Sequence, residues 1–429
     1  MSTLKEIYRK IIGYGTELLG LDLRYFASGG FWTALGQGIN GVISFLLVIA
    51  FANLLPKETY GLYRYILSLA GIFNVFTMTG MNTAVSQAVA AGNEGALRAS
   101  VRYQLKWNII MAIALWSFGG YYFVNNNPAL AISFFIFGAF APLISAFNTY
   151  GAYLDGKKQF KINNLFSIFS TVIYATGMIL AMLLSSDILP LIIAYALTTL
   201  ISNLFFYWNT LRIFQPPLAP AGDVLRYGRQ LTFLGFIGPI VAQADSIILA
   251  HFWGPAQLAV YSLARAIPDK VGPLVKNIIN LGLPKLAVKN AEEIDKVFYK
   301  RVFQTLGLGA LLAAGYILLS PLVFKYLLPK YIDSIFYSQI LALSFIFIAP
   351  VGYIGTAINS QKMILAIVSS SVSSSIVKII LYIVLGIWGG ILGLVLAQVI
   401  YYIIVFFINI ILWKFKTPPI SGVCKTTEY

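Results

Sequence analysis

The stretch WGGILGLVLAQVIYYIIVFFINIILW, residues 388–413, decides the fold class because it contains no charged side chain. A helix needs about 20 mainly apolar residues to cross a hydrocarbon core roughly 30 Å thick, in which unpaired backbone groups are too costly. Together with this stretch, the segments that meet the test are 31–52, 61–89, 103–124, 129–153, 161–184, 188–210, 229–251, 257–283, 301–320, 332–355 and 363–385. The sequence therefore predicts an all-α integral membrane protein of about twelve transmembrane helices.

The composition excludes several other classes of protein. Hydrophobic residues make up 59% of the chain and charged residues 10%, whereas a soluble domain has roughly a quarter of its residues charged. One cysteine, Cys424, and one histidine, His251, leave little basis for a disulfide framework, a zinc site or a Ser/His/Asp triad. We therefore expect neither an enzyme nor a bound cofactor.

Basic residues sort by side of the membrane. Lysines and arginines gather in the N-terminal arm, in every second connection and in the tail, and the other connections hold only Lys57, Arg64, Lys325 and Lys330. Because positively charged loops stay cytoplasmic, both termini are predicted to be cytoplasmic. The net charge of +15 thus sets topology, and nucleic-acid binding is not expected because no basic domain lies outside the membrane.

The chain divides into two predicted lobes. A proline-rich connection, 215–222, follows six spans, and the segment from Ala52 to Tyr63 is echoed weakly from Ala250 to Tyr261. Both features indicate six-helix lobes around a central cavity. The predicted parts are a cytoplasmic amphipathic arm (1–28), a first lobe (29–211), a cytoplasmic linker (212–228), a second lobe (229–413) and a cytoplasmic tail (414–429). The arm is expected to lie along the membrane interface, and a frayed polar tail is the alternative.

Motifs in both halves resemble those of a known family. LLPKETYGLY at 54–63 and MNTAV at 81–85, with QADSIIL at 243–249, GP at 254–255 and VYSLA at 260–264, are similar to the polysaccharide-export flippases of the MOP exporter superfamily. The resemblance covers essentially the whole chain. It implies transport of an undecaprenyl-pyrophosphate-linked oligosaccharide from the cytoplasmic to the outer leaflet of a bacterial or archaeal inner membrane, with membrane lipid and other polysaccharide-assembly proteins as partners.

Ionisable residues inside the spans are the candidate site, because at membrane depth they normally face a watery cavity or a partner. We expect Arg265, Lys276, Lys378 and Lys270 to bind the pyrophosphate or sugar headgroup. On the eighth span Arg265, Asp269, Gly272 and Lys276 follow a spacing that places them on one helix face, and Asp245, Arg265 and Lys378 lie at similar predicted depths.

Two carboxylates accompany these cations. Asp245 and Asp269 are candidates either to restrain a cation or to bind the proton or sodium ion that drives exchange. The alternative for Arg265 is a neutral bridge to Asp269 one turn away, and the alternative for Lys270 is snorkelling to the interface. A serine-rich stretch, 369–375, suits either sugar hydroxyls or close helix packing.

Two other functions compete with the flippase. A multidrug or cation antiporter of the same superfamily would need an acidic cavity, whereas the second half has four basic against two acidic residues at depth. A membrane glycosyltransferase or polysaccharide polymerase would need a long outer loop carrying catalytic side chains, and here Glu58, Asp187 and Asp333 are isolated from one another.

Overall fold

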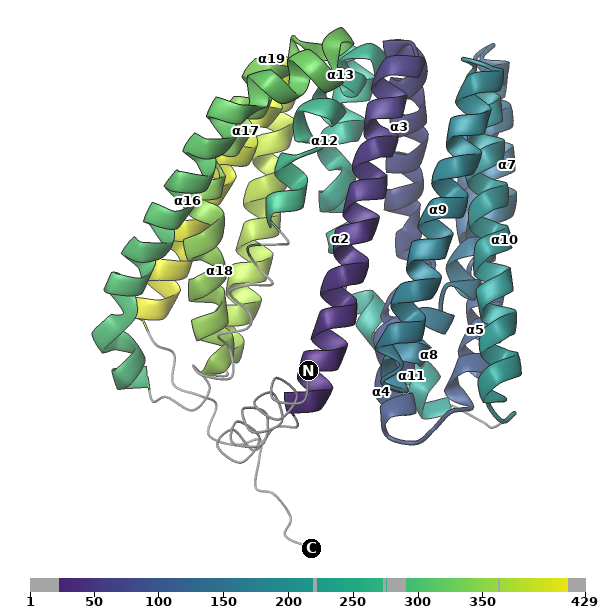
Figure 1. Ribbon diagram of the computed structural model, residues 1–429, viewed down its shortest axis with the longest axis horizontal. Helices are drawn as coiled ribbons and strands as arrows, with labels where there is room; N and C mark the ends of the chain where they lie inside the picture. The colour runs from purple at the N-terminus through teal and green to yellow at the C-terminus, as the bar shows by residue number, and fades with distance from the viewer. Residues whose placement is uncertain (1–22, 219–221, 273–274, 276–290, 362, 416–429) are drawn as a thin grey trace, which may run out of the picture. The chain divides into compact units, whose positions relative to one another are not determined.

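The computed structural model describes residues 23–218, 222–272, 275, 291–361 and 363–415 (Figure 1). Every regular element within these residues is helical, as predicted. Most of the predicted arm and tail, and Lys276 of the candidate site, lie outside the described residues.

The helices form two compact units, and the first comprises residues 1–47 and 73–236. Its elements are α2 (Leu23–Leu54, up to Leu47), η1 (Asn74–Phe76), α4 (Gly80–Ala90), α5 (Ala96–Trp107), α6 (Ile109–Val124), α7 (Pro128–Phe147), α8 (Tyr150–Gly156), α9 (Phe160–Leu184), α10 (Ile188–Phe214) and α11 (Gly222–Leu234). A buried cluster that includes Met81, Val85, Leu97, Tyr153 and Phe206 joins α4, α5, α8 and α10.

The second unit comprises residues 48–72 and 237–429. Its described elements are the end of α2, then α3 (Lys57–Phe73), α12 (Ile237–Trp253), α13 (Pro255–Arg265), α16 (Ala291–Leu327), η2 (Pro329–Tyr331), α17 (Ser334–Ala342), α18 (Phe345–Ser360) and α19 (Ile364–Lys414). Residues 48–72, which the sequence analysis assigns to the first lobe, thus pack with the second half of the chain.

The twelve predicted spans all overlap helical residues. Within the described residues, eight helices are long and apolar enough to cross a membrane, or nine if α11 and α12 count as one bent span. One of them, α19, covers the last two predicted spans and is divided at Gly390, whose φ of 54° and ψ of −133° are not helical. The predicted second span is interrupted between α3 and α4, so its pieces are too short to be counted singly.

The two echoed segments pack against each other inside the second unit. Pro255 starts α13 at the position where a missing N–H matters least, after Gly254 with φ of 87°. Gly61 on α3 approaches this helix start so closely that a Cβ there would lie 1.8 Å from the Pro255 carbonyl oxygen. Only glycine permits this contact, which brings the polar side chains of α3 and α13 near one another.

The eighth span is not one continuous helix, although the bond between Arg265 and Asp269 keeps these two side chains together as the sequence spacing predicts. Helix α13 ends at Arg265, a turn occupies residues 266–267, and helical structure resumes at Pro268. The physical reason is that proline lacks a backbone N–H and disfavours helical geometry in the residue before it. Asp269 consequently follows Arg265 across a break.

Candidate functional site

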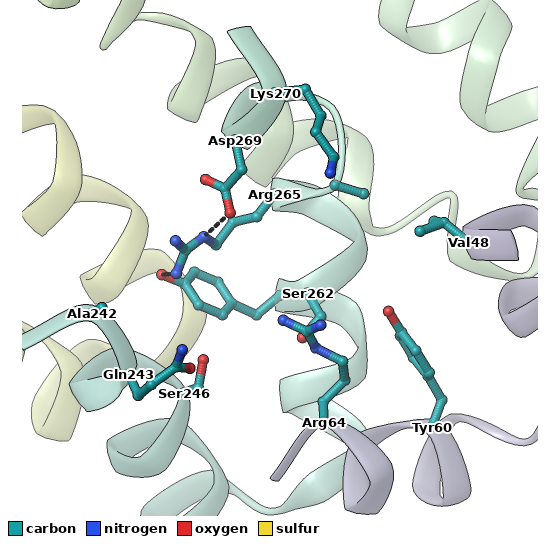
Figure 2. A pocket seen from close by; sticks show the side chains of 12 residues that line it. Val48, Tyr60, Arg64, Ala242, Gln243, Ser246, Ser262, Arg265, Asp269 and Lys270 are labelled. Carbon is teal, nitrogen blue, oxygen red and sulfur yellow. Dashed lines mark hydrogen bonds and ion pairs between the residues drawn. The ribbon is translucent and has the colours of Figure 1, made fainter. Parts of the chain in front are cut away.

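A polar cavity of about 280 Å³ lies within the second unit (Figure 2). Helices α3, α12 and α13 supply most of its walls. The lining residues are Val48, Tyr60, Arg64, Ala242, Gln243, Ser246, Tyr261, Ser262, Arg265, Ala266, Asp269 and Lys270. Three basic side chains and one carboxylate therefore line the cavity, which favours an anionic ligand.

Helical spacing explains which side chains reach the cavity. Tyr60 and Arg64 are four residues apart on α3, and Tyr261 and Arg265 repeat that spacing on α13, so each pair shares one helix face. Gln243 of α12 also approaches α3, since a Cβ on Gly71 would lie 2.9 Å from its Cγ. The three helices thus present polar side chains to one space.

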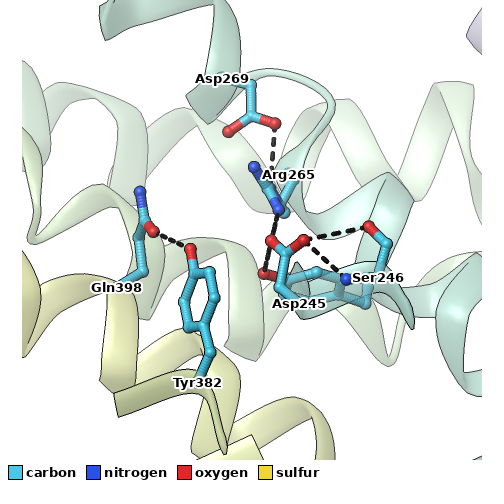
Figure 3. A network of polar contacts seen from close by, with 7 residues as sticks. Asp245, Ser246, Arg265, Asp269, Tyr382 and Gln398 are labelled. Carbon is cyan, nitrogen blue, oxygen red and sulfur yellow. Dashed lines mark hydrogen bonds and ion pairs between the residues drawn. The ribbon is translucent and has the colours of Figure 1, made fainter. Parts of the chain in front are cut away.

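Asp245 of α12 is the buried centre of a hydrogen-bond network (Figure 3). Its side chain is 1% exposed, and it accepts bonds from the Ser246 backbone N–H at 2.6 Å and the Tyr261 hydroxyl at 2.8 Å. The Arg265 guanidinium also donates to Asp245. A carboxylate so enclosed keeps its charge only because these donors and a cation surround it.

Arg265 contacts a second carboxylate as well. Its Nε donates to Asp269 at 3.0 Å, and the guanidinium stacks on the Tyr261 ring with 5.2 Å to the centroid. Asp269 is half exposed and also lines a smaller cavity of about 80 Å³ with Gln398 and Tyr402. The bridge that the sequence spacing allowed is therefore formed, and Arg265 is neutralised by two acidic partners.

Arg64 differs from Arg265 in that it forms no ion pair with any carboxylate of the described residues. Its Nε is buried, and within the described residues neither a hydrogen bond nor an ion pair satisfies it. Figure 2 shows its guanidinium extending from α3 among the cavity side chains. A buried guanidinium nitrogen without a partner is energetically unfavourable, so this arginine is ready to receive an anion.

Of the two described lysines of the predicted site, Lys270 lines the cavity and Lys378 lies elsewhere in the second unit. Lys378 of α19 lies over two tyrosine rings, 5.4 Å from the Tyr382 centroid and 5.2 Å from the Tyr401 centroid, and forms no ion pair within the described residues. Tyr382 in turn donates to Gln398. Lys270 lines the larger cavity, whereas Lys378 does not. The structure thus brings together Arg265, Asp245, Asp269 and Lys270.

Sequence reasoning missed Arg64 and the neutral lining of the cavity. Arg64 was counted with the basic residues of an outer connection, although it lies inside the segment 61–89 predicted as a span. The signal that could have identified it is the same one used for Arg265, a charged residue at membrane depth. The described residues hold no group of three or more histidine, cysteine, aspartate or glutamate side chains that could bind a metal.

Comparison with known proteins identifies the fold. An inward-facing multidrug resistance MATE family transporter of the MOP superfamily is similar over 88% of this chain and 94% of its own, with 15% identity and a TM-score of 0.62. The lipid II flippase MurJ in an inward closed conformation covers 90% of this chain and 87% of its own, with 15% identity and a TM-score of 0.58.

A third structure is a MOP superfamily transporter from Pyrococcus furiosus described as having a binding pocket of reverse polarity. It is 16% identical over 91% of this chain and 95% of its own, with a TM-score of 0.52. No curated protein sequence matches the chain. At these identities the solved structures establish a shared architecture, which is the predicted helical membrane fold.

The family follows from the sequence itself. A family model described as polysaccharide biosynthesis protein matches residues 26–268, which is more than half of the chain. This match confirms the resemblance on which the sequence analysis relied. The chain is therefore a multi-pass membrane protein that belongs to the polysaccharide biosynthesis protein family and has the fold of MOP superfamily transporters.

Proposed function

We propose that this protein is a flippase that moves an undecaprenyl-pyrophosphate-linked oligosaccharide repeat unit from the cytoplasmic to the outer leaflet by alternating access. The observation that carries the proposal is the cavity charge: Arg64, Arg265 and Lys270 outnumber Asp269 in the lining, and one positive charge remains in excess even when Asp245 behind Arg265 is counted. A diphosphate in a low-dielectric site needs cations, and a guanidinium can bind it through two parallel hydrogen bonds.

In this proposal the two arginines have different roles. Arg64 binds the pyrophosphate first because no carboxylate of the described part of the chain competes for its guanidinium. Arg265 joins when its bond to the half-exposed Asp269 opens, while its bond to the buried Asp245 persists. Lys270 adds charge at the cavity, and Lys378 and Lys276 remain candidates for contacts with the headgroup.

The family and the MurJ fold support this substrate class, and the cavity charge argues against the main rival. A multidrug exporter for organic cations needs anionic side chains, which the lining lacks apart from Asp269. We further propose that the protein lies in the cytoplasmic membrane with both termini cytoplasmic, beside other polysaccharide-assembly proteins, and that it has no enzymatic role. Asp269 is our candidate for proton or sodium coupling, since its carboxylate is accessible.

The decisive experiment is genetic complementation with a chemical readout. Deletion of the gene should cause lipid-linked repeat units to accumulate on the cytoplasmic face, where a membrane-impermeant glycosidase or lectin cannot reach them in intact cells. Wild-type protein should restore access, and Arg64→Gln should not at equal protein levels. The control is Lys325→Gln, an exposed charge change away from the cavity. Drug efflux without any change in repeat-unit accessibility would favour the exporter, and sugar transfer by purified protein would favour an enzyme.

A further inference from the structure

Two arginines on α5, in the first unit, have no acidic partner among the residues that the structure describes. Arg98 and Arg102 lie one turn apart on α5, and Tyr207 of α10 packs against the same buried cluster as Leu97 and Val101 of α5. The Nε of Arg98 is buried and unsatisfied within the described residues, whereas Arg102 is exposed. The preference of basic residues for cytoplasmic connections explains why positive charge gathers here. It does not explain why a guanidinium nitrogen is buried without an acceptor.

The nearest carboxylate along the chain is already engaged. Glu94 accepts a hydrogen bond from Lys157 Nζ at 2.5 Å and another from the Tyr153 hydroxyl at 2.9 Å. The hydrogen bond from Lys157 holds the pKa of Glu94 below its ordinary value. This carboxylate is therefore charged and already paired with Lys157. Within the described part of the chain, neither Arg98 nor Arg102 forms an ion pair, and their positive charge is uncompensated.

The surroundings of the pair favour a lipid over a free ion. The arginines stand at the start of an apolar span, 96–124, whose helix α6 exposes Ile109 and Ile113. On α10, the residue after Tyr207 is Trp208, which is 54% exposed and carries the Arg212 guanidinium 5.4 Å above its ring. Exposed apolar and indole surface beside cations is typical of the headgroup level of a bilayer.

We propose that Arg98 and Arg102, with Tyr207, form a binding site for the headgroup phosphate of an anionic phospholipid. On binding, the Arg98 side chain turns so that its Nε, buried and unsatisfied in the empty site, donates to the phosphate, while Arg102 adds a second cation and the acyl chains lie along the exposed apolar surface. This site belongs to the first unit and is separate from the cavity of Arg64 and Arg265. An occupied site should stabilise the packing of α5 and Tyr207 against the buried cluster that includes Leu97, Val101 and Phe206.

The test uses the full-length protein purified in detergent, titrated with phosphatidylglycerol or phosphatidylcholine, with bound lipid counted by native mass spectrometry. We expect phosphatidylglycerol to bind more tightly. Arg98→Gln with Arg102→Gln should weaken that binding about a hundredfold, since each hydrogen bond between charged groups contributes about tenfold. Arg98→Lys, which keeps the charge but loses the Nε donor, should give an intermediate affinity.

The matched control is Arg226→Gln with Arg229→Gln, which removes the same charge from two exposed positions on α11. This control should keep the preference for phosphatidylglycerol. An equal loss in both double variants, or equal binding of the two lipids to the wild type, would overturn the proposal. So would full displacement of phosphatidylglycerol by millimolar inorganic phosphate, because it would assign the site to a free anion. Thermal unfolding without lipid checks that each variant is folded.

Discussion

Substitution of the two cavity arginines should separate stability from transport. Arg265→Gln removes the cation from a carboxylate that is 1% exposed, and Asp245 would then keep only neutral donors. Arg64→Gln removes a guanidinium whose Nε is unsatisfied in the folded protein. We therefore expect the first variant to unfold more easily and the second to remain stable but transport poorly.

The magnitudes follow from burial. Breaking a buried ion pair by removing one partner costs about 3–5 kcal/mol, because an uncompensated charge remains. For a unit of about 200 residues this corresponds to a fall of roughly 10 °C in Tm. Loss of Arg64 should not lower stability, because it removes a buried donor that has no partner and breaks no ion pair among the described residues. Its effect on ligand affinity should reach about tenfold or more.

The assay pairs thermal unfolding of purified protein with repeat-unit translocation in proteoliposomes. The double variant Asp245→Asn with Arg265→Gln is the internal control, since removing both charges should recover much of the lost stability. The reasoning fails if Arg265→Gln unfolds at the wild-type temperature, because the bridge to Asp245 would then contribute nothing. It also fails if Arg64→Gln translocates its substrate at the wild-type rate.

Two further predictions concern packing and pH. Gly61→Ala places a Cβ 1.8 Å from the Pro255 oxygen, where 3.0 Å is the lower limit, and should lower the free energy of unfolding by about 1–3 kcal/mol. Gly38→Ala, with no atom within 4 Å, should be neutral or mildly stabilising in the same unfolding assay, and equal effects would contradict the close contact. The hydrogen bond from Lys157 lowers the pKa of Glu94 in the folded protein. The ionised Glu94 therefore contributes its full stabilisation at pH values above the ordinary pKa of 4.5, and this stabilisation is lost as the pH falls through the lower pKa of the folded protein. Glu94→Gln should therefore destabilise by no more than about 1 kcal/mol at pH 7 and by nothing in acid, and a constant difference between the two proteins would contradict this assignment.

The fold was predictable because the physics of a bilayer is simple. Length and apolarity located the helices, since a helix of about 20 apolar residues satisfies its backbone hydrogen bonds within itself and spans the hydrocarbon core. These criteria located the interruptions only approximately, since the last two predicted spans are separated at 386–387 and the break in α19 lies at Gly390. The turn after Arg265 depends on Pro268, and the break in α19 depends on the backbone angles of Gly390, which apolar composition does not specify.

The candidate site was predictable only in part. Charge at membrane depth identified Asp245, Arg265 and Asp269, and the structure brings these three together. The partnership of α3 with α12 and α13 was not predictable, because it joins residues 48–72 to the other half of the chain and depends on the contact between Gly61 and Pro255. The sequence therefore gives no indication that Arg64 and Arg265 line the same cavity.

The network around Arg265 also determines the order in which its bonds can exchange. Asp245 is 1% exposed and accepts bonds from Ser246 and Tyr261, so releasing it from Arg265 would leave a desolvated charge. Asp269 is half exposed, and water can replace its bond to Arg265 at little cost. An arriving anion should therefore displace Asp269 and leave Asp245 in place. When the site is empty, Asp269 compensates part of the charge of Arg265. The second guanidinium becomes available only when an anion is present. This exchange favours release of the anion on the far side of the membrane, because Asp269 can then return to Arg265.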